Sequence, residues 1–184
     1  MPLPITHALV PVAAALVRPG RPIPWRLVAA AAIASSLPDI DSFSPAIWRM
    51  PPQNSPLPAW WHRGATHSLF VAIAVGLIAA ALHSHLRVRP LVAGVVVGAA
   101  MASHGILDML ANQGVPIAYL WPLSSQRFFA DWRPILSSPV GLADVGPQLA
   151  HRLGAEVLQL ILPMFAVALF IRGILALSGS LRGR

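Results

Sequence analysis

Histidine and aspartate residues lie beside apolar runs in four separate segments of this sequence. Imidazole nitrogens and carboxylate oxygens are the usual ligands of Zn²⁺ and, with more oxygen, of Mn²⁺ or Fe²⁺. The sequence holds no cysteine, so any bound metal must have nitrogen and oxygen ligands. The candidate metal ligands are His7, Asp39, Asp41, His62, His67, His104 and Asp108.

A divalent metal held by these residues would favour hydrolytic chemistry. Such a metal lowers the pKa of a bound water toward about 7 and so supplies hydroxide. The candidate catalytic residues are Asp39, Asp41 and Asp108, of which Asp39 or Asp41 could act as general base if the metal leaves it free. The candidate ligands outnumber the four that one tetrahedral metal site binds. We therefore expect either two metals or one metal with further carboxylates orienting its histidines.

Arg63 stands between His62 and His67 in the sequence. A guanidinium group suits a phosphate or carboxylate of a substrate, and the start of the following helix offers free backbone N–H groups nearby. A phosphodiester substrate fits both features. The alternative is that Arg63 only neutralises Asp39 or Asp41.

Each of these residues also has an ordinary structural interpretation. A lone histidine such as His7 is often a helix cap or an interfacial side chain, and Asp39 could simply end its helix after a proline. His104 and Asp108 have the i, i+4 spacing of one buried pair on a helix face. Their joint occurrence favours the metal site, because unpaired charge is costly to bury beside apolar helices.

The apolar runs that position these residues predict a membrane protein. The chain is 56% hydrophobic and only 10% charged, whereas soluble domains are about 25% charged. Segments 66–83, 91–110 and 157–177 approach the roughly 20 apolar residues that a spanning helix needs, and segments 5–17 and 25–37 are shorter. We therefore expect an all-α, polytopic bundle of about five helices, three long and two short, in a single domain over 1–184 with its last membrane helix at 155–178.

The distribution of arginine predicts which ends of these helices lie together. If all five segments cross, loops 18–26 and 84–90 and the C-terminal tail share one side, and these short pieces are rich in arginine. The positive-inside rule places them in the cytoplasm. The candidate ligands then lie together on the opposite side, with the long loops 38–65 and 111–155.

Those two long loops are rich in proline and tryptophan. Tryptophan prefers the headgroup level of a bilayer, so the loops are expected to lie on the membrane surface. They serve either as anchors or as the lipid-facing rim of a site. The tryptophans concerned are Trp48, Trp60, Trp61, Trp121 and Trp132.

A short internal similarity suggests how two of the histidines are presented. Thr6 precedes His7 and Thr66 precedes His67, each at the start of an apolar run. Threonine is a favourable N-cap, so we predict that each threonine caps a helix and that each histidine lies in its first turn.

Other function classes find little support in the sequence. The formal net charge is +7, but the arginines are dispersed without a basic run, so no nucleic-acid partner is expected. The sequence has no G-x-S-x-G elbow, P-loop, dinucleotide fingerprint or H-E-x-x-H motif.

The ordered motifs resemble those of the YdjM-type family, bacterial inner-membrane proteins described as LexA-regulated, metal-dependent hydrolases. The resemblance covers about residues 1–130. It implies a multi-pass protein of the bacterial plasma membrane with a distant similarity to the zinc-dependent phospholipase C and P1-nuclease fold. The motifs are T-H at 6–7, P-D-I-D at 38–41, H-R-G-A-T-H-S-L at 62–69, S-H-G-I-L-D at 103–108 and L-W-P-L-S at 120–124.

Together these observations predict a membrane-bound metal-dependent hydrolase with Zn²⁺ as its first choice of metal and Mn²⁺ as the second. The expected substrate is a phosphoester, either a phospholipid or another membrane-associated molecule. The alternative is a non-enzymatic membrane protein whose metal is structural or sensory. A structural site is filled by protein ligands, whereas a catalytic site keeps one position open.

Overall fold

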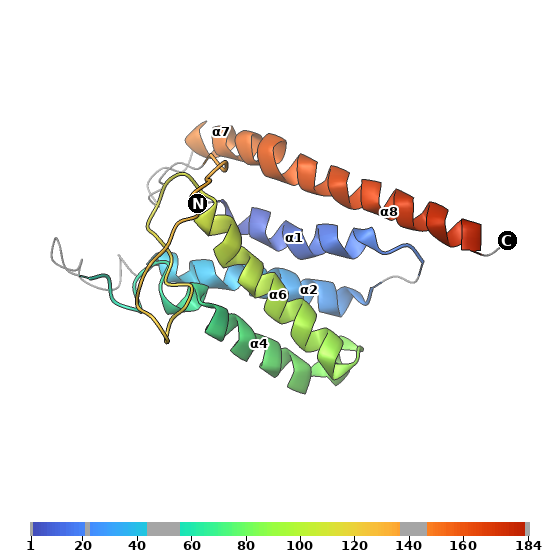
Figure 1. The fold of residues 1–184 in the computed structure, drawn as a ribbon, viewed down its shortest axis with the longest axis horizontal. Coiled ribbons are helices and arrows are strands. Elements are labelled where there is room, and N and C mark those ends of the chain that lie inside the picture. The colour runs from blue at the N-terminus through green and yellow to red at the C-terminus, as the bar shows by residue number, and fades with distance from the viewer. Residues whose placement is uncertain (1, 21–22, 44–55, 137–146, 183–184) are drawn as a thin grey trace.

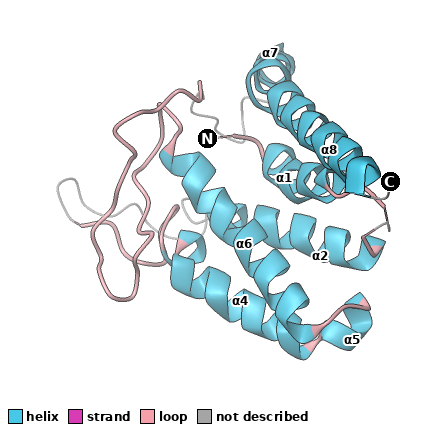
Figure 2. Cartoon of the chain, turned by 45° about the vertical axis from the view of Figure 1, so that its right-hand side comes forward, coloured by secondary structure: helices cyan, strands magenta, loops and turns pink. Residues whose placement is uncertain are grey.

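A computed structural model describes residues 2–20, 23–43, 56–136 and 147–182 of the chain, and the described part is helical without a strand (Figures 1 and 2). Two isolated β-bridges, Ala111 with Ile135 and Ile117 with Phe128, join parts of the loop that follows α6. The all-α prediction is therefore confirmed.

Helices α1 (Pro4–Val17) and α2 (Trp25–Ser36) follow each other and pack side by side (Figure 1). Pro4 starts α1, a position where its missing N–H and fixed φ do no harm. The N-cap of α1 is Leu3, so Thr6 lies inside the helix and the predicted threonine cap is wrong. α2 ends before Pro38 and continues as a 3₁₀ helix, η1 (Leu37–Phe43).

Helix α4 (Leu69–Ala81) begins later than the sequence predicts. Ala65–His67 forms a short 3₁₀ turn, η2, and the N-cap is Ser68, whose Oγ accepts a hydrogen bond from Val71 N at 3.2 Å. The cap predicted at Thr66 is wrong for this reason, and the helix expected over 66–83 is short rather than long. A further helical turn, α5 (His83–Leu86), leads toward α6.

Helix α6 (Pro90–Met109) has 20 residues, close to the predicted 91–110. It packs backbone to backbone on α4, because glycines face each other where the two helices meet. A Cβ added at Gly76 would lie 2.8 Å from the Gly94 carbonyl oxygen and 3.2 Å from Gly98 Cα. Small residues permit this close approach in membrane helices as well as in soluble ones.

The C-terminal helix forms one continuous rod from α7 (Pro147–Glu156) through a π-helical segment, η3 (Val157–Ile161), to α8 (Leu162–Arg182). It runs beside α1 in the same direction (Figure 1). At one end Leu3 N donates to the Glu156 carboxylate, and at the other Arg172 Nη1 donates to the Leu16 carbonyl at 3.1 Å.

Two helical stretches of the described chain are long and apolar enough to cross a membrane, Pro90–Met109 and Leu153–Ser178. Pro4–Val17 and Leu69–Ala81 are apolar but shorter. Only 6% of the apolar window in Leu153–Ser178 is buried inside the protein. Most of its side chains thus have no protein cover, as expected of a helix that faces lipid.

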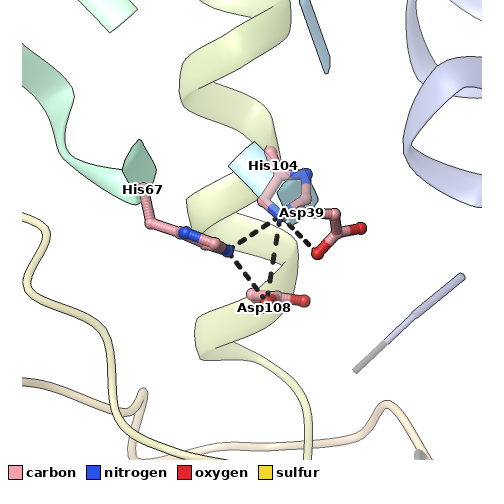
Figure 3. Close-up of side chains that lie close together, drawn as sticks. All are labelled: Asp39, His67, His104 and Asp108. Atoms are coloured by element: carbon pink, nitrogen blue, oxygen red, sulfur yellow. Dashed lines mark hydrogen bonds and ion pairs between the residues drawn. The ribbon is translucent and has the colours of Figure 1, made fainter. Parts of the chain in front are cut away.

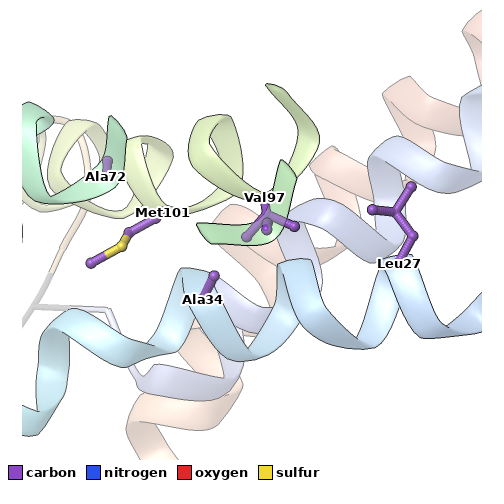
Figure 4. Close-up of a cluster of buried hydrophobic side chains, with 6 residues drawn as sticks. Leu27, Ala34, Ala72, Val97 and Met101 are labelled. Atoms are coloured by element: carbon purple, nitrogen blue, oxygen red, sulfur yellow. The ribbon is translucent and has the colours of Figure 1, made fainter. Parts of the chain in front are cut away.

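The hydrophobic core lies where α2, α4 and α6 meet (Figure 4). Its packing fixes these three helices relative to one another. Leu27 and Ala34 of α2 face Ala72 of α4 and Val97 and Met101 of α6. The alanines among them, Ala34 and Ala72, allow the close helix spacing.

The loop tryptophans differ in exposure. Trp132 is 73% exposed and Trp60 48%, whereas Trp61 is 5% exposed and belongs to the packed interior. An anchoring role at the headgroup level thus fits Trp132 and Trp60 but not Trp61. Trp48 lies outside the described residues.

Candidate metal centre

Four chain segments bring their histidines and aspartates to one end of the bundle. The first turns of α1 supply His7, η1 supplies Asp39 and Asp41, the turn before α4 supplies His62, Arg63 and His67, and the last turns of α6 supply His104 and Asp108. All of these side chains except His62 are buried. Figure 3 shows the innermost group, Asp39, His67, His104 and Asp108, whose ligand atoms lie within 4.8 Å of one another.

Hydrogen bonds fix the tautomers of the two central histidines. His104 Nδ1 lies 2.7 Å from the Ser35 carbonyl oxygen, which only accepts, so the proton is on Nδ1. His67 Nδ1 lies 3.1 Å from Asp41 Oδ2, which also accepts. The Nε2 atoms of both rings are therefore the free coordinating atoms, and they face each other at 3.1 Å.

Two imidazole lone pairs at this separation repel unless a proton or a metal ion lies between them. Burial lowers the pKa of His67, but hydrogen bonds with Asp108 and Asp41 outweigh it and raise that pKa to about 9. The cluster thus favours a positive charge at His67, and the same carboxylates would favour a metal cation.

The spacing of the other ligand atoms fits a shared ion better than direct hydrogen bonds. His67 Nε2 is 3.6 Å from Asp108 Oδ2, and His104 Nε2 is 3.5 Å from Asp39 Oδ1. Both separations exceed a normal hydrogen bond. A zinc ion with bonds of about 2.0–2.1 Å places tetrahedral ligand atoms about 3.3 Å apart.

Asp39 and Asp108 support the same conclusion. The carboxylate oxygens of Asp39 are buried and have no hydrogen-bond partner among the described residues, whereas Asp108 is buried and forms an ion pair with Arg63 through Oδ2 at 2.9 Å. Burying a carboxylate without a hydrogen-bond partner, as at Asp39, costs desolvation free energy, and a coordinated cation offsets that cost. Asp39, His67, His104 and Asp108 are therefore positioned to bind a metal ion with two nitrogen and two oxygen ligands.

His7 lies against this group as a fifth donor. Its ring stacks on that of His104 with centroids 3.7 Å apart, and its Nε2 is 3.6 Å from Asp108 Oδ1. Neither ring nitrogen has a hydrogen-bond partner within the part of the chain that the structure describes. His7 is thus free to approach the ion from the α1 side.

Asp41 and His62 lie further out than the sequence alone suggests. Asp41 Oδ1 is 2.6 Å from His62 Nδ1, and Asp41 Oδ2 accepts from Arg63 N at 3.0 Å as well as from Thr66 and His67. Burial raises the pKa of Asp41, but hydrogen bonds from His62 and His67 lower it below its usual range. Asp41 is therefore an ionised acceptor that orients His67, the arrangement that commonly stabilises metal-bound histidine.

The side chain of Arg63 is fully buried. Its Nε lies 2.9 Å from Asp108 Oδ2, and its Nη1 donates to the Val115 carbonyl at 2.8 Å. The carboxylate that it neutralises is thus Asp108 rather than Asp39 or Asp41. Its role toward a substrate anion remains a prediction.

Gly105 allows the histidine segments to approach each other. A Cβ at this position would lie 3.0 Å from the His67 carbonyl oxygen and 2.9 Å from the Tyr119 ring. The glycine after His104 thus lets the η2 turn rest directly on α6.

Two further residues support the centre and were not found from the sequence. Glu156, buried in the C-terminal helix, accepts from Leu3 N at 2.9 Å and from the Thr6 hydroxyl, so it ties that helix to the turn that carries His7. Arg127 donates to the His62 carbonyl at 3.0 Å and to the Pro58 carbonyl. The position of Glu156, an acidic residue beside an apolar helix, could have indicated a functional or structural role. Nothing in the sequence distinguishes Arg127 from other loop arginines.

Comparison with known proteins agrees with the membrane character of the chain. The model of a family described as YdjM inner membrane protein matches residues 1–179. The inner membrane protein YbcI of Escherichia coli (strain K12) is 32% identical over 157 residues, which cover 83% of this chain and 86% of YbcI. No solved structure gives a significant match.

Proposed function

We propose that this chain, which belongs to the YdjM family of inner membrane proteins, is a multi-pass hydrolase that depends on a divalent metal, with Zn²⁺ as the first candidate. The observation that carries the proposal is the buried pair of His67 and His104 Nε2 atoms, 3.1 Å apart and flanked by the buried carboxylates of Asp39 and Asp108. The proposed substrate is a phosphoester of the membrane.

The multi-pass arrangement is supported by the two long apolar stretches, Pro90–Met109 and Leu153–Ser178, and by the arginines, whereas α1 and α4 are too short to span alone. α1 and α4 have 14 and 13 residues, so each is about 20 Å long, less than the roughly 30 Å of a bilayer core. Both pack along longer partners, and the polar cluster lies at the end of the bundle opposite Arg18, Arg87 and Arg89. The positive-inside rule then gives the cluster a periplasmic or exterior location.

A bound divalent metal would supply Lewis-acid activation of water and of the phosphoryl group. His67 and His104 would hold it through Nε2, together with the Asp108 carboxylate, which also forms an ion pair with Arg63. Asp41 is occupied by several donors, whereas Asp39 has unpartnered oxygens within the described chain. Asp39 is thus better placed than Asp41 to accept the proton of the attacking water. The water oxygen would bond to phosphorus as the ester P–O bond breaks, and the proton accepted by Asp39 would pass to the leaving alkoxide, which departs as the alcohol.

A structural or sensory metal site is the second candidate, and the burial of the centre favours it. His104 and Asp108 have no exposed surface, and Asp39 is only 6% exposed. Closed sites of this kind commonly stabilise a fold, whereas catalytic sites leave one coordination position to water.

Metal analysis of the purified protein, combined with a hydrolysis assay, separates these functions. We expect the wild type to hold a divalent metal and to hydrolyse bis-p-nitrophenyl phosphate, and a His67→Ala/Asp108→Ala variant to lose both properties. Retention of the metal by this double variant would contradict the ligand assignment. Metal binding without hydrolysis of any phosphoester would favour the structural function.

A further inference from the structure

An apolar groove runs between α1 and α2 and ends at the metal centre. We call it the α1–α2 groove. It has a volume of about 520 Å³ and is open along one side. Its lining includes Pro4, Ala8, Ala32, Ile33, Ser36 and Asp39.

Asp39 is the charged residue of this lining within the described chain. Asp39 is only 6% exposed, and no described residue donates a hydrogen bond to its carboxylate. The other polar group, the Ser36 hydroxyl, already donates to the Pro4 carbonyl at 2.9 Å. The groove therefore combines apolar walls with a single free carboxylate that also belongs to the metal-binding group.

The rim of the groove carries exposed apolar side chains, as a lipid-facing surface does. Ile33 is 67% exposed and Ile40 61% exposed beside it, so its rim is apolar. From Pro4 to Ala8 it descends one helical turn, about 6 Å, from the level of the metal centre toward the apolar middle of the bundle. A molecule entering from lipid would meet apolar walls first and Asp39 last.

Within the described residues, another approach to the centre is covered by the loop that follows α6. The Tyr119 carbonyl accepts from Leu69 N at 2.9 Å, and Ala118 N donates to the Arg63 carbonyl at 3.0 Å. These bonds hold the loop across the ends of α4 and α6, where His67 and Arg63 lie. The α1–α2 groove thus provides a path that the loop does not close.

We infer that the α1–α2 groove admits a phosphoester lipid laterally from the bilayer, with its alkyl chain between Ala8 and Ala32 and its phosphate at the metal centre. This inference rests on the proposed function and specifies its substrate class. A carboxylate-lined metal centre recognises the phosphate through the cation, and the uncharged walls recognise the chain. A water-soluble phosphoester would gain nothing from those walls.

A second apolar groove provides a matched control. It lies between α1, α2 and α6, has a similar volume of about 540 Å³, and is lined in part by Ala15, Val96 and Ser103. None of the four residues positioned to bind the metal lines it. Ala15 and Ala32 are both partly buried alanines in apolar helices.

The test compares two phosphodiesters with the same p-nitrophenyl leaving group, one with a dodecyl and one with a methyl ester. Ala32→Phe fills the α1–α2 groove, and Ala15→Phe fills the control groove. We expect Ala32→Phe to lower kcat/KM for the dodecyl ester by about tenfold or more, the range that small changes in an apolar pocket produce. Its activity on the methyl ester should stay within about twofold of wild type, and Ala15→Phe should leave both activities unchanged.

Equal effects of Ala32→Phe on the two esters, or no effect on either, would overturn the inference. Crosslinking with a diazirine-labelled dodecyl phosphate keeps the test independent of turnover. Label mapped to the α1–α2 groove, and lost in Ala32→Phe but not in Ala15→Phe, would support lipid entry even if wild type hydrolysed neither ester and the proposed hydrolase function failed. Label spread evenly over the exposed face of α8 would contradict it.

Discussion

Helices α4 and α6 touch backbone to backbone, whereas α1 and α8 are joined by charged side chains at both ends of their contact. The first pair meets at Gly76, Gly94 and Gly98, where no added Cβ fits without a short contact. The second pair is linked by Glu156 at one end and Arg172 at the other. The close-packed pair carries His67, His104 and Asp108, and the polar-linked pair carries His7.

The two halves of the centre also differ in how their histidines are fixed. His67 and His104 each have a hydrogen-bond acceptor on Nδ1, namely Asp41 and the Ser35 carbonyl. Among the described residues, the His7 ring has its stacking on His104 and its proximity to Asp108 but no hydrogen-bond acceptor. We conclude that the α4–α6 half is preorganised for a metal, and that the α1 half adds a donor whose position depends on the C-terminal helix.

Replacing a histidine in each half gives the most direct contrast. His104→Ala should weaken metal binding by more than about 100-fold, beyond the loss typical of outer partners, because it removes a preorganised Nε2 donor. His7→Ala should weaken it by less than about tenfold, because four ligand atoms remain. Isothermal titration of the metal-free proteins with Zn²⁺ measures both changes, and an equal loss in the two variants would refute the difference between the halves.

Asp41 tests the preorganisation of His67 without removing a proposed ligand of the innermost group. Asp41→Asn should lower metal affinity by about 10–100-fold, because His67 loses the carboxylate that orients its ring. Asp131→Asn is the control, since Asp131 is exposed in the loop after α6. The same titration applies, and an affinity equal to wild type in Asp41→Asn would show that His67 is held by other contacts.

The pH dependence of metal binding follows from the raised pKa of His67, about 9. Below that pH the metal-free protein carries an additional proton on this ring, and the metal must displace it. Apparent affinity should therefore rise with pH, by up to about tenfold per unit, and level off near the pKa. Competition with a metal indicator across neutral to alkaline pH measures the slope, and a flat profile would contradict displacement of a proton from His67.

The helices were largely predictable because proline and apolar composition delimit them. Pro4 and Pro90 start α1 and α6, and the predicted ranges for both helices agree with the structure to within one residue at the start. The start of α4 was not predictable, because Thr66 and Ser68 are both good N-caps and only the tertiary fold selects Ser68. The choice shortens the helix and leaves His67 in a 3₁₀ turn.

The candidate centre was predictable as a group but not in its internal order. Topology alone suggested that the histidines and aspartates share one end. Which of them are innermost depends on contacts between distant segments, such as His104 with the Ser35 carbonyl, 69 residues apart. Glu156 shows the same limit, because its partner Leu3 is 153 residues away and no local pattern links the two.

Substitutions of glycine test the packing of the α4–α6 half. Gly76→Ala should destabilise the protein by about 1–3 kcal/mol, because its Cβ meets backbone atoms that cannot move independently. Gly173→Ala in α8 is the matched control, since nothing described lies within 4 Å of a Cβ there. Thermal unfolding in detergent measures the difference. A Gly76→Ala protein as stable as Gly173→Ala would mean that the two helices separate without cost.

Glu156 tests the polar connection of the α1–α8 half, where the smallest effect on metal binding is expected. Glu156→Gln keeps one acceptor oxygen for Leu3 N or Thr6 but removes the charge, so the contact should lose about 1 kcal/mol, the difference between a hydrogen bond to a charged group and one to a neutral group. Metal affinity should fall less than in His7→Ala, because the substitution only loosens the turn that carries His7. Hydrogen exchange at the first turns of α1, measured beside the Zn²⁺ titration, distinguishes the two consequences. Faster exchange with nearly unchanged affinity is expected, whereas a loss of affinity as large as that of His104→Ala would mean that the C-terminal helix is required for the centre itself.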